Sequence, residues 1–271
     1  MFFDDLQFDC ENVPQEDVRT NDVIRKWIMA KGKANVKLDT PIYKIFPIER
    51  FSELMLARKI AFTHPKKWDD PAEYSFISRY QEYSNICVEN ATKRDYCDFY
   101  GQCWSMNKSC DGLWRTYTKD RTKLAVQVKS TIGAIAKAYI SANVSFLCNL
   151  FCGKVVYDLS EKLKKRVAKI TPGSIVEDLD SLFYKRQDFQ YEQEVRFVVT
   201  VTERSGRLFE NGKTLRDDKY ALVRFLDCDW IDQCVVSPWA SPMEEGLVKE
   251  LAKFGGVKTS KVKMSDLYEA W

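Results

Sequence analysis

Residues 42–47 (IYKIFP), 48–58 (IERFSELMLAR) and 59–63 (KIAFT) decide the fold class of this chain. The first segment alternates as a β-strand does, and Pro47 ends it because proline cannot donate to a strand ladder. The second segment has apolar residues at the spacing of one helix face, at Ile48, Phe51, Leu54 and Met55. The third segment is again typical of a strand. A strand, a short helix and a strand in direct succession predict a mixed α/β (α+β) fold.

The rest of the chain continues this mixture. Outward from the opening unit we expect a helical, aromatic-rich segment up to about residue 100 and a turn over residues 112–117. Further helices are expected from residue 130, over 161–170, 179–185 and 242–254. Strands are expected over residues 102–106, 124–129, 151–157, 194–200, 221–225, 231–236 and 262–264. Because no repeat or low-complexity linker interrupts it, residues 41–271 are predicted to be one domain, preceded by an N-terminal appendage over residues 1–40.

The composition is that of an ordinary folded protein. Of the 271 residues, 45% are hydrophobic and 30% are charged, which is enough apolar surface to offset the ordering entropy of folding. The net charge of +3 does not by itself indicate a nucleic-acid binder. No run approaches the ~20 apolar residues of a membrane helix, and residues 1–5 (MFFDD) do not resemble a signal peptide. We therefore expect a cytoplasmic protein that does not associate with a membrane.

Cysteine and histidine usage argues against a metal site. The chain has nine cysteines, none in a Cys-x-x-Cys pair, and its single histidine is His64. A zinc site takes paired ligands at short spacing, usually with histidines among them. We expect reduced, buried thiols and no bound metal.

The segment YEQEVRFVV, residues 191–199, is the strongest candidate for chemistry. Glu192 and Glu194 are two residues apart, so both carboxylates are expected on one face of a strand or of its entry. Like charges so close together repel, so their placement needs a reason. One reason is a site in which one carboxylate binds a ribose and the other orients an acceptor. The structural interpretation is a solvated strand edge on which Arg196 forms a salt bridge.

Two further clusters also have a functional and a structural interpretation. Residues 68–71 (WDDP) are either a turn closed by an aspartate side chain or part of a carboxylate cluster. Trp114 and Tyr117 lie three residues apart after a glycine, so both can face one side of a short helix. They are either core residues or an aromatic platform for a flat ring.

A series of short segments, in this order, resembles an uncharacterised prokaryotic family. The segments are Tyr43-Lys44, residues 68–71, Leu113-Trp114-x-x-Tyr117, Tyr191-x-x-Glu194-x-Arg196, Val236-Ser237-Pro238 and residues 265–268 (SDLY). The family is domain of unknown function twenty-nine seventy-one, and the resemblance runs from about residue 42 to residue 268. The family usually carries Asn where Asp69 stands, and its name implies no activity.

A second resemblance does imply an activity. Residues 42–46 (IYKIF), followed by a helix and a short strand, look like the opening of ADP-ribosyltransferases that modify nucleic acids. In the wider superfamily a glutamate opens a late strand, as Glu194 does, and many members have Glu or Gln two residues upstream, where Glu192 lies. Two residues depart from the family pattern, because Lys44 replaces an expected His or Arg and Phe46 replaces an expected Thr.

This resemblance implies an ADP-ribosyltransferase-like fold, with a split central sheet and flanking helices, and NAD as the substrate. It implies that Glu194 stabilises the cationic ribose centre electrostatically and that Glu192 orients the acceptor. The residues that it assigns to NAD are Tyr43, Lys44, Trp114 and Tyr117. It also implies a nucleic-acid or protein acceptor, an antitoxin or other inhibitory partner, and a role as a toxin or in phage defence.

The leading prediction is therefore NAD-dependent transfer of ADP-ribose to a macromolecule, and two alternatives stay open. A metal-dependent nuclease would use Asp69, Asp70 and Glu73, with a lysine and Mg²⁺. A non-enzymatic binding module would use the aromatic residues only as core.

Overall fold

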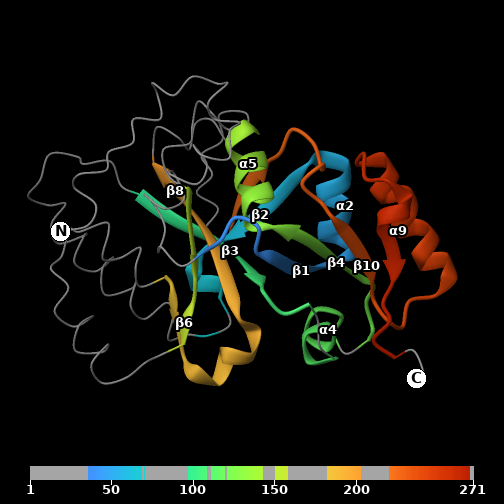
Figure 1. Cartoon of the computed structure of the whole chain (residues 1–271), viewed down its shortest axis with the longest axis horizontal. Helices are drawn as coiled ribbons and strands as arrows, with labels where there is room; N and C mark the ends of the chain where they lie inside the picture. Colours follow the sequence, from blue (N-terminus) through green and yellow to red (C-terminus); the bar gives the residue numbers. More distant parts are fainter. Residues whose placement is uncertain are drawn as a thin grey trace, which may run out of the picture.

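The computed structural model describes residues 36–68, 70, 97–108, 111–119, 121–142, 150–157, 182–202 and 220–268 (Figure 1). Residues 1–35 of the predicted appendage lie outside these ranges, as do the segments predicted as helices before residue 97 and over 161–170.

A large mixed sheet forms the centre of the described chain, so the prediction of a mixed α+β fold with a central sheet is confirmed. Its strands are β1 (Pro41–Pro47), β2 (Lys59–Thr63), β3 (Cys97–Ser105), β4 (Ala125–Thr131), β5 (Leu150–Lys154), β8 (Glu194–Thr202), β9 (Tyr220–Arg224), β10 (Gln233–Val236) and β11 (Val262–Met264). They run in the order β11-β10-β4-β1-β3-β2-β9, with β8 paired to β3 and β5. Within this sheet the pair β10–β11 is parallel and the other described pairs are antiparallel. A separate parallel pair joins β6 (Val156–Tyr157) to β7 (Tyr184–Lys185).

The sheet opens between β1 and β3. Strand β1 pairs with β4 along its whole length but meets β3 only where Tyr43 faces Ser105. Likewise β2 meets β3 only where Thr63 faces Gly101, whereas β3 and β8 pair from end to end. Lys44 bridges the opening, because its Nζ donates to the Cys103 carbonyl at 2.8 Å. The two halves of the sheet therefore diverge on either side of Lys44.

Three helices cover one face of the sheet. Helices α2 (Ile48–Ala57), α5 (Ile132–Ala142) and α9 (Pro242–Phe254) contribute buried side chains to the main core, together with Ile42 and Phe46 of β1. Helix α9 begins with a capping box between Ser241 and Glu244, which satisfies two free backbone N–H groups. No helix in the described part of the chain combines the length and the apolar character that a membrane crossing requires.

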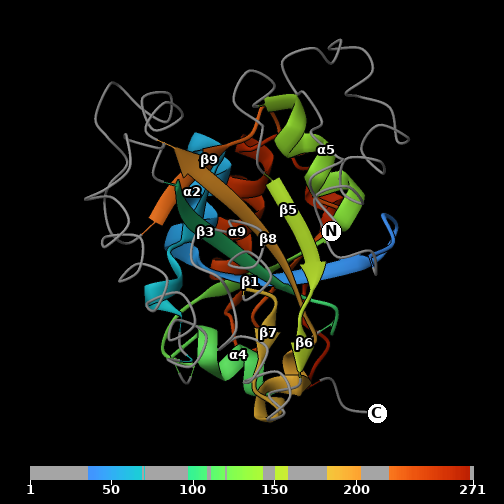
Figure 2. The same ribbon diagram turned by 90° about the vertical axis from the view of Figure 1, so that its left-hand side faces the viewer.

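The opposite face carries shorter elements and two smaller apolar clusters. Helix α4 (Asp111–Tyr117) packs on Ile45 and Ala125 through Trp114, and the second cluster joins Phe99 and Val198 to Leu182. The 3-10 helices are η3 (Pro65–Lys67), η5 (Gln187–Glu192) and η6 (Thr259–Lys261). Figure 2 shows α4 and the β6–β7 pair at the same end of the sheet.

Several predicted elements differ from the structure. Residues 97–100, predicted to end a helix, belong to β3, where pairing with β8 overrides their local preference. The described end of the helix predicted over 179–185 is instead strand β7, and the turn predicted over 112–117 is helix α4. The single strand predicted over 151–157 is divided into β5 and β6.

Candidate active site

The two glutamates of the YEQEVRFVV segment lie at the junction of η5 and β8. Glu192 ends η5, Gln193 has a left-handed backbone with φ of 42°, and Glu194 begins β8. Of the two predicted placements, a strand or its entry, Glu192 lies in the entry, because the turn at Gln193 places it before the strand. The turn is fixed on β3, since Ser105 Oγ donates to the Glu192 carbonyl at 2.6 Å and the Met106 N–H donates to the Gln193 carbonyl at 2.9 Å.

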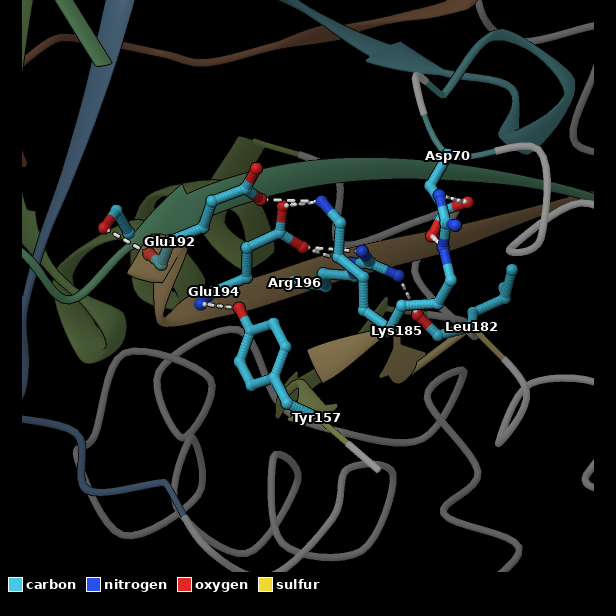
Figure 3. A network of polar contacts seen from close by, with 9 residues as sticks. Asp70, Tyr157, Leu182, Lys185, Glu192, Glu194 and Arg196 are labelled. Atoms are coloured by element: carbon cyan, nitrogen blue, oxygen red, sulfur yellow. Dashed lines mark hydrogen bonds and ion pairs between the residues drawn. The ribbon is translucent and has the colours of Figure 1, made fainter. Parts of the chain in front are cut away.

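The two carboxylates nevertheless meet, because they share one lysine (Figure 3). Lys185 Nζ, on β7, lies 2.6 Å from Glu192 Oε2 and 3.1 Å from Glu194 Oε1. The other oxygen of Glu194 accepts from Arg196 Nε at 2.7 Å and from Arg196 Nη2 at 2.6 Å. Arg196 is 0% exposed and Glu194 is 7% exposed, so this is a buried ionic network and not the solvated edge of the structural interpretation.

Neighbouring groups hold the network in place. Arg196 Nη1 donates to the Leu182 carbonyl at 2.6 Å, and the guanidinium lies 4.3 Å from the centre of the Trp68 ring. The Glu194 N–H donates to the Tyr157 hydroxyl at 2.7 Å. Trp68 lies so close to Gly101 that a Cβ there would be 2.5 Å from the indole, so glycine is required. Each charged group is thus positioned by a partner on another element.

The network moves the pKa values of the two glutamates in opposite directions. Burial by itself would raise the pKa of Glu194, but Arg196, Glu192 and Lys185 together hold it well below its usual range. For Glu192, burial and then the neighbouring Glu194 carboxyl raise the pKa to about 7, against the opposing effect of Lys185. At neutral pH Glu194 is therefore a carboxylate, while Glu192 can gain or lose a proton.

A cavity of about 470 Å³ lies beside this network on the same face of the sheet. Both glutamates, Lys185 and Arg196 line one part of it, and residues of β1, β2, β3, β4, α4, η3 and η5 contribute to the rest. Of the residues predicted to bind NAD, Tyr43, Lys44 and Tyr117 line the cavity. Burial lowers the pKa of the Lys44 ammonium, against the opposing effects of Cys103 and Glu194.

Trp114 does not belong with these residues. It is 0% exposed, is not among the residues that line the cavity, and packs in the core with Ile45 and Ala125. The alternative that Trp114 stacks on a ligand is therefore wrong, because its ring is enclosed beneath α4. Tyr117, which is 37% exposed at the end of the same helix, is the aromatic residue of that pair that a ligand can reach.

The aspartates proposed for the nuclease do not form a site in the described residues. Asp70 is 1% exposed and bound by Arg186, whose Nε and Nη2 lie 3.0 and 2.9 Å from its two oxygens. Asp69 and Glu73 lie outside the described residues. Among the residues that are described, no three His, Cys, Asp or Glu side chains gather as metal ligands would.

Lys185 and Trp68 are the members of the network that the sequence did not identify as such. Lys185 lies in a segment predicted as a helix, and Trp68 lies in residues 68–71, which are predicted as a turn or as part of a carboxylate cluster. Neither has a local sequence signal, because each reaches the glutamates through strand pairing and packing between distant segments.

Comparisons with known proteins give one weak likeness. No family model matches the sequence, so the resemblance to domain of unknown function twenty-nine seventy-one is not supported, and no curated protein matches it either. Among solved structures, the chain is similar to DarT of Thermus sp. 2.9 in complex with ADP-ribosylated ssDNA. The two are 12% identical with a TM-score of 0.36, over 85% of this chain and 96% of DarT. A TM-score this low does not establish a common fold, so a functional proposal has to rest on the residues of the site.

Proposed function

We propose that this chain is an ADP-ribosyltransferase that takes ADP-ribose from NAD and transfers it to a nucleic acid, with the reaction centre at Glu194. The observation that carries the proposal is a buried carboxylate, kept ionised by Arg196 and Lys185, that opens a strand beside a cavity at the divergence of the sheet. The split sheet and this placement of Glu194 correspond to the ADP-ribosyltransferase-like fold that the sequence resemblance implies.

An ionised glutamate suits the chemistry of NAD cleavage. When the bond between nicotinamide and ribose C1′ breaks, the electron pair leaves with the ring nitrogen and positive charge develops on the ribose. A fixed negative charge stabilises such a centre far better inside a cavity than in water. Glu194 Oε1 accepts from Lys185 at 3.1 Å, and a carboxylate oxygen has capacity for more than one donor, such as a ribose hydroxyl.

Glu192 is suited to the acceptor side of the reaction. Its side chain is more exposed than that of Glu194, at 19% against 9%, so an incoming acceptor reaches it first. With a pKa of about 7 it can take a proton from the acceptor as that group attacks C1′. Lys185 contacts both carboxylates, so it fixes the positions of Glu192 and Glu194 relative to each other.

The remaining cavity residues suit the rest of NAD. The Lys44 ammonium provides a positive charge for a ribose or pyrophosphate oxygen, with Tyr43 beside it on β1. Tyr117 presents an aromatic face at the cavity wall, on which a flat ring can stack. The toxin or phage-defence role and an inhibitory partner belong to the same proposal but have no separate structural support.

The test is incubation with NAD labelled in its adenylate moiety together with single-stranded DNA, double-stranded DNA, RNA or cell-extract protein. We expect label in nucleic acid with the wild type and none with Glu194→Gln. A thermal-shift titration accompanies it, because a ligand that binds the native state raises stability by mass action. If millimolar NAD produces no thermal shift and no acceptor takes up label, the proposal is refuted and the binding-module alternative remains.

A further inference from the structure

Gln127 is a buried polar residue of the cavity that the proposed chemistry does not use. It lies in the middle of β4, between Ile45 on β1 and Val235 on β10. Directly opposed residues point to the same face of a sheet, so Gln127 shares the face of Ile45, which is the cavity face. Gln127 is 2% exposed and lines the cavity.

The side-chain amide of Gln127 has no hydrogen-bond partner among the described residues. The other buried polar side chains that line the cavity do have partners, and they are Gln102, Lys185, Glu194 and Arg196. In the cavity such an amide can bond to water, so a ligand that displaces the water has to replace those bonds. Among the buried polar side chains that line the cavity, Gln127 therefore has an amide that is available to hydrogen-bond a ligand.

The cavity residues that β4 and α4 contribute are uncharged. From β4 and α4, the cavity receives Gln127 together with Leu113, Thr116 and Tyr117, and Ile45 lies opposite on β1. The Thr116 hydroxyl is already engaged, since it donates to the Gly112 carbonyl at 2.9 Å. An apolar and aromatic pocket with one free amide fits a neutral flat ring that carries a group able both to donate and to accept.

We propose that Gln127 hydrogen-bonds the carboxamide of nicotinamide and makes the cavity selective for the amide over the corresponding carboxylate. This inference rests on the proposed use of NAD. A primary carboxamide offers an N–H donor and a carbonyl acceptor, so it pairs with the amide of Gln127 through two hydrogen bonds. Nicotinate offers only acceptors and brings a negative charge into the uncharged end of the cavity, so it satisfies half of the Gln127 amide at most.

The register of the sheet gives a separation that suits this assignment. Glu194 faces Ser105, Ser105 faces Tyr43, and Tyr43 faces Lys129 on β4. Three strand spacings amount to roughly 14 Å, and Gln127 lies two residues further along β4. Both residues line the same cavity, so they border it at two separated positions. One ligand can therefore reach Glu194 with a ribose hydroxyl and Gln127 with its carboxamide.

The experiment measures nicotinamide and nicotinate binding by titration calorimetry, at neutral pH, to the wild type and to Gln127→Leu. We expect the wild type to bind nicotinamide about tenfold or more tightly than nicotinate, and the variant to lose that preference. Gln233→Leu is the matched control, because Gln233 lies on the neighbouring strand β10 and does not line the cavity. It should keep the wild-type preference. Gln127→Met, closer in length to glutamine, replaces the leucine variant if the latter does not fold.

The possible outcomes separate this inference from the proposed function. Equal nicotinamide binding by the wild type and Gln127→Leu, or no preference in the wild type, would overturn the role of Gln127. Transfer of ADP-ribose from NAD at wild-type efficiency by Gln127→Leu would also overturn it while leaving the transferase intact. Selective nicotinamide binding that depends on Gln127, without transfer to any acceptor, would instead support the amide site and overturn the transferase.

Discussion

Replacing Glu194 by glutamine separates a catalytic role for this residue from a purely structural one. The change keeps the size of the side chain but removes the counter-charge of Arg196, which is 0% exposed. Breaking a buried ion pair destabilises a protein by about 3–5 kcal/mol. Glutamine still offers one oxygen to Arg196, so we expect a loss of about 2–4 kcal/mol in the free energy of unfolding. A loss of that size leaves a domain of ordinary stability folded at room temperature.

The catalytic loss should be larger than this instability explains. Removing the charge that stabilises the cationic ribose centre should lower the turnover of NAD by about 10²-fold or more. The assay combines urea unfolding, which gives the folded fraction, with release of nicotinamide from NAD under conditions where the variant is folded. Activity is then expressed per folded molecule.

Asp70→Asn is a matched control for this experiment. It removes a carboxylate charge that is also buried, at 1% exposed against 7% for Glu194, and paired with Arg186, but Asp70 does not line the cavity. We expect it to lose stability and to keep its activity per folded molecule. If Glu194→Gln behaves in the same way, Glu194 is a structural ion-pair partner and our assignment of the reaction centre is wrong.

Three further predictions concern pH, Lys44 and metal dependence. Because folding raises the pKa of Glu192 from 4.5 to about 7, the folded state holds one more proton than the unfolded state between those values. Stability should therefore fall by about 1–3 kcal/mol as pH rises through that range. Glu192→Gln should flatten this slope in urea titrations, and an unchanged slope would contradict the assignment. Lys44→Met should raise the KM for NAD about tenfold or more with a smaller change in kcat, since it removes a charge that binds the substrate; equal KM values would exclude that role. Transfer should survive EDTA, because no proposed step uses a cation, whereas loss of activity that Mg²⁺ restores would favour the nuclease.

The fold could be predicted largely from local patterns. The strand, helix and strand of residues 41–63 follow from alternation and helical spacing, and the structure has them as β1, α2 and β2. Helix α9 follows from its amphipathic pattern and the Gly255-Gly256 end. The errors fall where a long-range partner decides the backbone. Residues 97–100 form a strand because β8 pairs with them, and β7 forms beside β6, which is far away in the sequence.

The residues of the site also divide into those that the local sequence indicates and those that depend on a long-range partner. Glu192 and Glu194 could be selected from sequence because two like charges at the entry of an apolar strand segment repel and need a reason. Gln127 could not be selected, because a glutamine in the strand AVQVKST is unremarkable until the facing residues are known. Its side chain points to the cavity only because β4 pairs with β1 in the register that sets Gln127 opposite Ile45. A slip of one residue would turn Val126 or Val128 into the cavity and place the amide in the main core. The chemistry of this cavity therefore depends on strand register as much as on residue identity, and register is a tertiary property.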